Sequence, residues 1–440
     1  MVSAILSVYY HGQEAAVMSY DAEKNLGSFE YTPEFVKTGL QLSPLKMPLK
    51  AKKVYQFPQL NPATFKGLSG LVSDSLPDRF GTSVLNQWMA QPGRTQPISV
   101  MERLQYTGTR GMGALEFRPS KQLKKLNASQ AIDLEKLTEL AQSVVNNRKK
   151  LSVSITKDKT DAQTMKSLLA VGTSAGGARP KAVLAFNQDF SQVRSGQVKA
   201  PEGFEHYLIK FDGVSEHNQN EETFGDPMGY GTMEYVYYLM ATACGIDMQE
   251  CHLLDEGSRR HFITKRFDRI GNDKVHIQTL CAINHVDYNT PGSFSYEELF
   301  TVARQLRLPL YDAKQLFLRM AFNHIARNND DHAKNFSFIY QNNKWRLSPA
   351  YDIAYCYKPN NLWVERHWMS ANGKRQDHTR TDLIAVGANV TKLPHSLMHE
   401  MIDKVLESVS QWNRLAKTHG VPKGLRQEIG INLPLGDFGR

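Results

Sequence analysis

The most constraining feature of this chain is a polar segment, Asn329–Phe336, that follows a long amphipathic helical pattern. It reads Asn-Asp-Asp-His-Ala-Lys-Asn-Phe and places Asp330 and Asn335 five positions apart. Two strand-like runs within residues 336–347 flank a Gln-Asn-Asn turn and predict a β-hairpin. Asp352 follows the hairpin directly. A fold with this order of elements brings a second carboxylate back towards Asp330 and Asn335.

This order of polar residues has a known chemical use. In protein kinases an Asp accepts the proton of the substrate hydroxyl, an Asn five positions later binds magnesium, and a second Asp after a hairpin binds it too. The His-Arg pair that precedes the kinase Asp is replaced here by Asn328 and Asn329. The spacing alone is weak, because Asp330, Asp331 and Asp352 could be turn residues and helix caps. The order of carboxylate, amide, hairpin and carboxylate favours the catalytic interpretation.

A glycine-rich stretch, residues 172–181, offers backbone donors for phosphate groups. It leads into a predicted strand at 181–186, and Arg179 and Lys181 supply cations. The stretch is not a Walker A loop, because Ala-Arg rather than Lys-Ser or Lys-Thr follows Gly177. Taken alone, such a loop is more often an ordinary turn.

Lys210 stands inside an apolar strand pattern, Tyr207–Phe211. A lysine in a strand interior is costly to bury unless it is paired. It is either a phosphate-binding lysine or a charge that protects the edge of a sheet. Glu234, on a predicted helix at 233–243, is a candidate partner for its ammonium group.

Composition bounds the class of protein but does not identify its chemistry. The chain has 440 residues, of which 41% are hydrophobic and 22% charged, which is typical of a globular protein with two or three domains. No window contains the ~18 consecutive apolar residues of a membrane helix, and the start lacks a basic leader, so we expect neither a membrane span nor a secretory signal. Four cysteines without CxxC spacing fit a reducing cytoplasm. The net charge of +9 permits DNA, tRNA or ATP as a partner without selecting one.

The pattern along the chain changes from strands to helices. Strands are predicted at 3–10 and 27–31, a basic linker at 118–125, and further strands up to residue 267. The helices predicted beyond Gly271 include 296–306, 312–327 and 398–416. We therefore expect an α+β chain with three parts: an N-terminal β-rich subdomain at 1–125, a sheet-rich lobe at 126–268 and a helical lobe at 269–440.

Together these residues resemble the HipA-type serine/threonine kinases, the toxins of bacterial toxin–antitoxin modules. The specific motifs are Asp331–Phe336 and Tyr351–Ile353. Supporting matches are Leu76-Pro77-Asp78, Gly113-Ala114-Leu115, the loop Ser174–Lys181, Lys210, Arg266–Arg269 and Gln278–Cys281. The resemblance implies a two-lobed protein-kinase-like fold, with an extra N-terminal subdomain on the sheet-rich N-terminal lobe and a mainly helical C-terminal lobe.

The resemblance also implies roles for individual residues. Asp330 would be the catalytic base, and Asn335 and Asp352 would bind Mg²⁺. The residues implied in ATP binding are Ser174, Ala175, Gly176, Gly177, Lys181, Lys210, Lys265, Arg266, Phe267, His332 and Lys334. Within this set, 265–267 would form the hinge that binds adenine, with Phe267 on the ring. Lys265 departs from the acidic residue common there, which leaves adenine affinity open if that side chain contributes.

Ser174 matches the serine that this family autophosphorylates. A phosphate there adds about two negative charges, which would repel ATP and switch the kinase off. The family typically phosphorylates a serine of an aminoacyl-tRNA synthetase and pairs with a small helix-turn-helix antitoxin of the HipB type, so DNA contact would be indirect. Two alternatives remain: a catalytically idle kinase fold that acts as a co-repressor with an antitoxin, and a nucleic-acid-binding protein suggested by the charge of +9.

Overall fold

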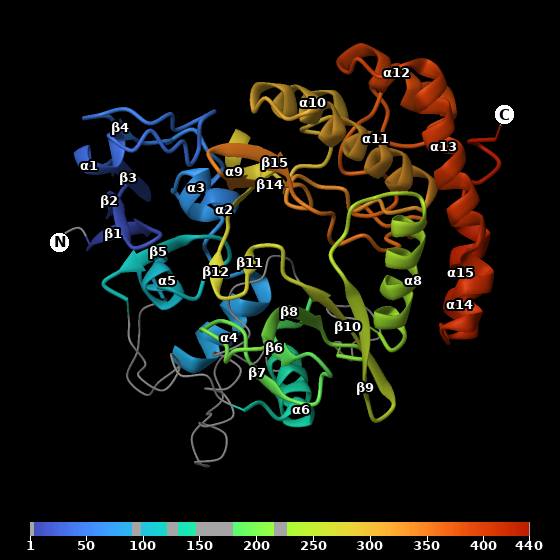
Figure 1. The fold of residues 1–440 in the computed structure, drawn as a ribbon, viewed down its shortest axis with the longest axis horizontal. Coiled ribbons are helices and arrows are strands. Elements are labelled where there is room, and N and C mark those ends of the chain that lie inside the picture. The colour runs from blue at the N-terminus through green and yellow to red at the C-terminus, as the bar shows by residue number, and fades with distance from the viewer. Residues whose placement is uncertain (1–3, 90–97, 121–130, 147–178, 215–226, 440) are drawn as a thin grey trace.

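The computed structural model describes residues 4–89, 98–120, 131–146, 179–214 and 227–439. A five-stranded sheet lies at one end, a second five-stranded sheet lies in the middle, and helices fill the other end (Figure 1). The predicted α+β class, with a sheet-rich lobe, an extra N-terminal subdomain and a helical C-terminal lobe, is confirmed.

The N-terminal subdomain is built on an antiparallel sheet with the strand order β4-β3-β2-β1-β5. Its strands alternate buried and exposed residues because only one face packs on the core. The strands are β1 (Ala4–Tyr10), β2 (Gln13–Asp21), β3 (Leu26–Tyr31), β4 (Val54–Tyr55) and β5 (Leu115–Arg118). The helices of this region are α1 (Pro33–Val36), α2 (Pro62–Phe65), α3 (Gly70–Ser73), α4 (Arg79–Met89) and α5 (Val100–Thr107).

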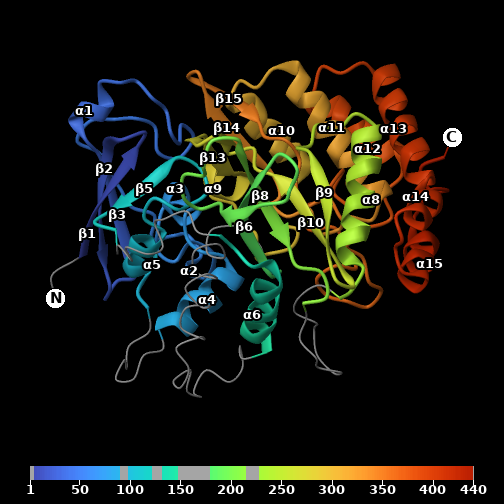
Figure 2. The ribbon, with the colours of Figure 1, turned by 60° about the horizontal axis from the view of Figure 1, so that its bottom comes forward.

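The middle sheet has the order β7-β6-β8-β10-β9 and is antiparallel throughout. Its strands are β6 (Lys181–Asn187), β7 (Val193–Ser195), β8 (Phe204–Lys210), β9 (Cys251–Glu256) and β10 (Arg259–Lys265). Two helices accompany it, α6 (Leu134–Asn146) and α8 (Tyr230–Ala243). Helix α4 lies beside α6 below this sheet (Figure 2), and the two helices share one hydrophobic core with it.

The C-terminal lobe is mainly helical, with a three-stranded sheet in the order β13-β14-β15. Its strands, with the small β11–β12 ladder, are β11 (Arg269–Ile270), β12 (Asp273–Lys274), β13 (His276–Thr279), β14 (Ser337–Gln341) and β15 (Lys344–Leu347). Its helices are α9 (Leu280–Asn284), α10 (Tyr296–Gln305), α11 (Leu310–Ile325), α12 (Arg380–Val390), α13 (His395–Ser410), α14 (Trp412–Thr418) and α15 (Lys423–Asn432).

The predicted hairpin after the polar segment is confirmed as β14 and β15. Asn342 and Asn343 both have positive φ, 50° and 59°, which a two-residue turn of this kind requires and which Asn tolerates. The prediction of one continuous helix over 398–416 was wrong. The structure has α13 and α14 there, separated at Gln411, because the ladder of helical hydrogen bonds is interrupted and α14 turns to pack on α15.

The N-terminal subdomain docks closely on the C-terminal lobe. Gly70 in α3 lies so near α9 that a Cβ atom there would stand 2.1 Å from the Ala282 carbonyl oxygen, which no other residue could accommodate. Asp74, just after α3, accepts hydrogen bonds from the Thr279 backbone nitrogen at 2.7 Å and hydroxyl at 2.9 Å. This contact fixes the start of α9, which lies next to the polar segment.

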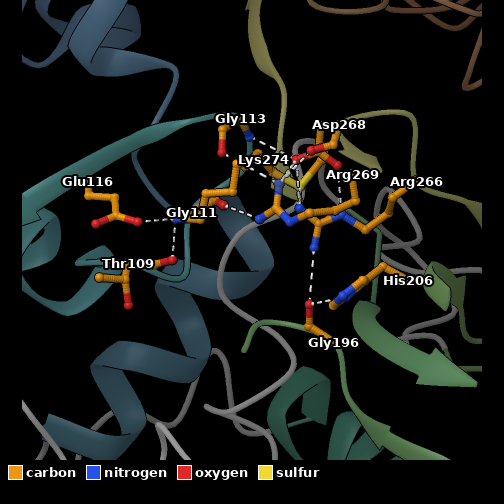
Figure 3. Close-up of polar contacts among 11 residues, drawn as sticks. Thr109, Gly111, Gly113, Glu116, Gly196, His206, Arg266, Asp268, Arg269 and Lys274 are labelled. Carbon is orange, nitrogen blue, oxygen red and sulfur yellow. Dashed lines mark hydrogen bonds and ion pairs between the residues drawn. The ribbon is translucent and has the colours of Figure 1, made fainter. Parts of the chain in front are cut away.

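A second junction is a buried polar network centred on Asp268 (Figure 3). Both carboxylate oxygens accept from the Arg266 guanidinium, at 2.8 and 2.7 Å, and Oδ2 also accepts from Arg269 at 2.6 Å. The Gly113 backbone nitrogen donates to Oδ2 at 2.8 Å, and Arg269 in turn donates to the Gly111 carbonyl at 3.0 Å. The network therefore joins the segment Arg266–Arg269, which follows β10, to the loop before β5.

Lys274 on β12 extends this junction. Its ammonium donates to the Thr109 carbonyl at 2.6 Å and pairs with Glu116 of β5 at 2.9 Å (Figure 3). The predicted boundary between 268 and 269 falls inside this network, and the boundary at 125 falls outside the described residues. Both boundaries stay predictions.

Asp268→Ala is expected to destabilise the protein by about 3–5 kcal/mol, because it leaves the buried Arg266 and Arg269 guanidinium groups without their counterion. Urea unfolding at neutral pH measures the loss. Asp255→Ala is the matched control: Asp255 also pairs with an arginine, Arg260 at 2.9 Å, but its side chain is 74% exposed. A surface pair contributes about 0–1 kcal/mol. Equal losses in the two variants would show that the network does not stabilise the junction.

Candidate active site

The polar segment forms a loop whose backbone is fixed from two sides. On one side it pairs with the chain after Asp352, and on the other with the start of α9. The hydrogen bonds run from Asn329 N to Cys356 O at 3.1 Å, from Leu280 N to Phe336 O at 2.8 Å and from Cys281 N to Ala333 O at 3.1 Å. Because α9 is itself held by Asp74, the N-terminal subdomain supports this loop indirectly.

Two adjacent aspartates in the loop have opposite environments. Asp331 is buried and saturated, accepting from the Tyr296 hydroxyl at 2.8 Å, His367 Nδ1 at 2.9 Å and the Trp368 nitrogen at 2.7 Å. The Asp330 side chain is 42% exposed, with His332 Nε2 3.7 Å from its Oδ1. Asp331 therefore holds the loop in place, and Asp330 can meet a substrate.

The pKa of Asp330 is raised. Desolvation by the surrounding protein is the main cause, and the nearby charge of Asp352 adds to it. His332 and Arg179 act in the opposite direction. A carboxylate with a raised pKa is a better proton acceptor near neutral pH than an ordinary one.

The structure brings Asn335 and Asp352 together, since both line one small cavity beside the loop. The Asn335 amide nitrogen donates to the Asp330 carbonyl at 2.7 Å, which fixes the orientation of that amide. Asp352 has φ +51°, a conformation that costs a non-glycine residue about 1 kcal/mol or more. Such strain persists where surrounding contacts enforce it, and it clusters at functional sites.

Lys210 is the contact that holds Asp352. Its buried ammonium bridges Glu234 of α8 and Asp352, with 2.5 Å to Asp352 Oδ1, so the predicted Lys210–Glu234 pair is confirmed. Burial works to lower the pKa of Lys210, but the two carboxylates raise it above its ordinary value. Burial likewise works to raise the pKa of Asp352, but Lys210 and Lys181 bring it well below its usual range. Lys210 and Asp352 are therefore charged, whereas burial raises the pKa of Glu234 although Lys210 opposes that rise.

Lys181 and Lys210 are register partners in the antiparallel β6–β8 ladder, and both are buried. Like charges directly opposite one another destabilise a sheet unless anions offset them. Arg179, two residues before Lys181, adds a third positive charge that acts on Asp330 and Asp352. The sequence indicated Arg179 only as a cation of the glycine-rich loop; its action on both carboxylates depends on the fold.

The three residues expected to form a hinge run from the end of β10 into the Asp268 network. Phe267 faces Tyr351, with ring centroids 5.6 Å apart and planes 30° apart. Lys265 pairs with Glu205 of β8 at 2.5 Å, and the Arg266 guanidinium is bound to Asp268. Their backbone nitrogens are engaged too, because Lys265 N donates to the Glu250 carbonyl and Arg266 N to the His206 carbonyl, both at 2.9 Å. Ser174, Ala175, Gly176 and Gly177 lie outside the described residues.

Two family models match this chain. The HipA N-terminal domain matches residues 6–118, and the HipA-like C-terminal domain matches residues 173–412, more than half of the chain. The chain belongs to the HipA family. Residues 173–181 of the glycine-rich stretch, Lys210 and the polar segment all fall inside the second match.

Individual relatives match smaller parts. The chain is 28% identical over 199 residues to Toxin YjjJ of Escherichia coli (strain K12), covering 44% of this chain and 41% of that protein. It is 26% identical over 135 residues to the Putative kinase Y4mE of Sinorhizobium fredii (strain NBRC 101917 / NGR234), covering 28% and 32%. The chain thus spans less than half the length of these curated relatives.

The fold matches a solved HipA structure across almost the whole chain. HipA of Shewanella oneidensis MR-1, solved with HipB and its operator DNA, superposes with a TM-score of 0.64 at 16% identity, covering 98% of this chain and 95% of that one. At this identity the match shows the fold alone. Within the described part of this HipA-family chain, none of the helices combines the length and apolar character needed to cross a membrane.

Two aspartates of the N-terminal subdomain, Asp74 and Asp78, also act electrostatically on Lys334 in the loop of this HipA-family chain. Lys334 of the loop lies 4.5 Å from the Tyr288 ring centroid. Burial works to lower its pKa, but Tyr288 and Cys281, and after them Asp74 and Asp78, raise it. Asp78 caps α4 by accepting from the Gly81 nitrogen at 2.5 Å, and its Oδ2 is buried without a hydrogen-bond partner among the described residues.

In the sequence, Asp78 is distinguished only as part of the supporting motif Leu76-Pro77-Asp78. Burial raises its pKa to about 7, although the charges of Lys181 and Lys334 oppose that rise. No local sequence signal distinguishes this aspartate from any other helix cap, because its desolvation comes from elements distant in the chain.

Asp78→Asn should change how stability depends on pH. The pKa of Asp78 is about 7 in the folded chain and about 3.9 when unfolded. The folded state thus binds more protons between these values, and Asp78 reduces stability as pH rises through them. Asparagine keeps the cap but cannot ionise. Relative to wild type, the variant should gain stability from pH 5 to pH 8 in urea unfolding.

Glu202→Gln, at an exposed position before β8, is the control for this measurement. Its stability difference from wild type should be the same at both pH values. If Asp78→Asn also shows a pH-independent difference, the carboxyl does not titrate with a raised pKa.

Proposed function

We propose that this HipA-family chain is an ATP- and Mg²⁺-dependent protein serine/threonine kinase. The observation that carries the proposal is the triad in which the buried Lys210 ammonium bridges the buried Glu234 and the partly exposed Asp352. Protein kinases need a strand lysine paired with a helix glutamate, together with a magnesium-binding aspartate, for activity. Here the lysine is on β8, the glutamate is on α8, and the aspartate follows the β14–β15 hairpin.

The residues present fit ATP. Lys181 and Lys210 oppose one another in the sheet, and Arg179 lies within electrostatic range of the same carboxylates, so the site holds a concentration of buried positive charge. Phosphate oxygens are the anions that such a cluster binds well. Phe267, beside Tyr351, supplies an aromatic surface for a base.

The residues present also fit Mg²⁺. Asp352 and Asn335 line the same cavity and offer carboxylate and amide oxygens, which are the ligands that this cation prefers. Bound there, Mg²⁺ would neutralise charge on the phosphate oxygens. Asp330, the exposed aspartate of the loop, would orient the substrate hydroxyl and accept its proton at a carboxylate oxygen. His332 and Lys334 lie in the same loop and would contact the phosphates.

The proposed regulation acts at Ser174. Autophosphorylation there would place about two negative charges in the loop that leads to Arg179 and Lys181, where ATP phosphates would otherwise bind. The phosphorylated loop would compete for those cations and repel ATP. Kinase activity would then fall.

The proposed biological role is that of a toxin in a toxin–antitoxin module. Its partial relative YjjJ is described as a toxin, and the Shewanella HipA was solved with HipB and operator DNA. We infer a small helix-turn-helix antitoxin of the HipB type as partner, DNA contact through that partner, and a serine of an aminoacyl-tRNA synthetase as target. The cytoplasm, where such targets are found, is the proposed location.

Asp330→Asn should slow phosphoryl transfer severely while nucleotide binding persists. The dephosphorylated full chain is incubated with Mg²⁺ and labelled ATP, and the labelled residue is found by mass spectrometry. Wild type should carry label on Ser174. The variant should lose about 10²–10⁴-fold in rate, because a positioned base contributes that much. Fluorescent ATP binding should change little.

Asp255→Asn, at an exposed surface aspartate, should label as wild type does. Full labelling in Asp330→Asn would show that Asp330 is not the base. A folded wild-type chain that binds ATP but takes no label, on itself or on a panel of aminoacyl-tRNA synthetases, would favour the idle co-repressor.

The chain alone should bind DNA weakly, and the helix-turn-helix partner should confer binding to the DNA upstream of its own gene. Fluorescence anisotropy at several salt concentrations measures both. Neutralisation of phosphates by lysine and arginine makes affinity fall steeply with salt. Tight, salt-sensitive binding by the isolated chain would contradict an indirect role and favour the nucleic-acid-binding alternative.

A further inference from the structure

Two large apolar side chains are exposed in the segment that follows Asp352. Leu362 is 92% exposed and Trp363 is 46% exposed. Single exposed apolar residues are ordinary at a protein surface, whereas adjoining ones mark surfaces that bind a partner. Tryptophan is among the residues that contribute most to such binding, because its large ring leaves water on contact. The pair is therefore a candidate contact for another molecule.

The residue before Asp330 fixes the turn that carries this pair. The Asn329 amide nitrogen donates to the Val364 carbonyl at 3.0 Å and to the Glu365 carbonyl at 3.1 Å. Trp363 precedes these two residues directly. Its position relative to the proposed catalytic base is thus set before any partner binds, and a preorganised side chain loses less conformational entropy on binding.

Ring contacts connect the pair to Asp330. The Trp363 ring stacks on Trp368, with centroids 5.8 Å and planes 18° apart. Trp368 meets the His332 ring edge-on at 5.8 Å, and His332 Nε2 lies 3.7 Å from Asp330 Oδ1. We call Leu362, Trp363 and Trp368 the apolar shelf. The shelf therefore adjoins the place where a substrate hydroxyl would meet Asp330.

A second series of contacts leads from His332 to the N-terminal subdomain. The His332 ring meets Tyr288 edge-on at 5.5 Å, and the Lys334 ammonium lies 4.5 Å from the Tyr288 ring centroid. The Asn289 amide nitrogen donates to the Thr64 hydroxyl at 2.8 Å, which ties this turn to α2. The end of α2 is thereby held near Tyr288.

Positive charge gathers at the end of α2. Lys66 follows α2 directly and is partly exposed. Desolvation lowers the pKa of Lys66, and the charges of Arg103, Arg79 and Lys334 lower it further, so these four cations lie close together. The Arg103 Nε atom is buried without a hydrogen-bond partner in the described part of the chain. We call Lys66, Arg79 and Arg103 the cationic end. Like charges held together in this way favour the binding of an anion.

We propose that the apolar shelf and the cationic end together bind the segment of a protein substrate that carries the target serine. An apolar side chain of that segment would pack on the shelf, and a carboxylate would pair with the cationic end. This inference rests on the proposed kinase function, because the shelf is assigned to the substrate by its place beside Asp330.

The contacts also limit where the apolar residue of the substrate stands. Two ring contacts of 5.8 Å place Trp363 within about 12 Å of His332, and an extended chain advances about 3.3 Å per residue, so an apolar residue roughly two to four positions from the serine would reach the shelf. A polypeptide supplies this residue and a carboxylate in one short segment. A nucleic acid fits less well, because Leu362 gives a base no ring on which to stack.

The test measures peptide binding and phosphoryl transfer separately, on the dephosphorylated full chain. The probes are short fluorescein-labelled peptides with one serine, in which leucine or tryptophan replaces alanine at one position at a time and glutamate replaces glutamine. Without ATP, fluorescence anisotropy should show that wild type binds peptides with an apolar residue at the expected positions at least about tenfold more tightly than their alanine counterparts. Glutamate should likewise be preferred to glutamine.

Trp363→Ala should remove the apolar preference, and Lys66→Met should remove the preference for glutamate. The matched controls are Ile431→Ala, at an 84% exposed residue of α15, and Lys24→Met, at a side chain that is 76% exposed; both should bind as wild type does. With ATP and Mg²⁺, Trp363→Ala should raise KM for the preferred peptide at least about tenfold and change kcat by less than about twofold, because the shelf contributes equally to binding in the ground and transition states.

The outcomes separate docking from catalysis. Selective binding that Trp363→Ala abolishes, without transfer to any peptide or to the chain itself, would support the docking surface and contradict the kinase function. Equal binding of apolar and alanine peptides by wild type, or an unchanged preference in folded Trp363→Ala, would overturn the proposal. A different occupant would also overturn it: the loss of a dimer, of the helix-turn-helix partner or of a single-stranded oligonucleotide in Trp363→Ala, with no peptide preference in wild type.

Discussion

The triad of Lys210, Glu234 and Asp352 is the interaction on which the site depends. It connects the middle sheet, helix α8 and the segment after the β14–β15 hairpin, so three elements far apart in the chain meet at one ammonium group. Burying these charges costs several kcal/mol per ion, and only their mutual attraction and hydrogen bonding offset that cost. Removing one member would leave the others unpaired. The same triad holds Asp352 in its left-handed conformation.

The N-terminal subdomain supports the loop through a continuous set of contacts. Asp74 holds Thr279, the neighbouring α9 backbone binds the loop at Ala333 and Phe336, and Gly70 permits the close approach of α3 to α9. The Asp268 network holds the same subdomain to the strand after β10. A region to which no catalytic chemistry is assigned thus sets the position of the proposed catalytic groups. Sequence patterns could not show this, since the contacts join residues about 200 positions apart.

Much of the fold could be predicted from local patterns. The hairpin after the loop, the strand with Lys210 and the long helix before the loop are strong signals, because turn chemistry and periodicity act over few residues. The Lys210–Glu234 pair could be predicted because a buried lysine requires a partner. The different environments of Asp330 and Asp331 could not be predicted. Two identical neighbouring residues differ only in the tertiary structure that packs against each of them. The meeting of His324, His367 and His378 could not be predicted either, because these residues are 43 and 11 positions apart in the chain.

The pairing of β6 with β8 has a consequence for how this site tolerates change. Residues 181–186 of β6 are buried on both faces, so hydrophobicity does not distinguish one alignment of the strand from the next. Lys181 opposite Lys210 does distinguish them, because a shift by one residue would turn Lys181 to the other face, away from the carboxylates. The charge of Lys181 therefore specifies how β6 aligns with β8, in addition to its proposed role in binding phosphate. A single-residue deletion in β6 would misplace a cation even though every side chain of the site remained in the sequence.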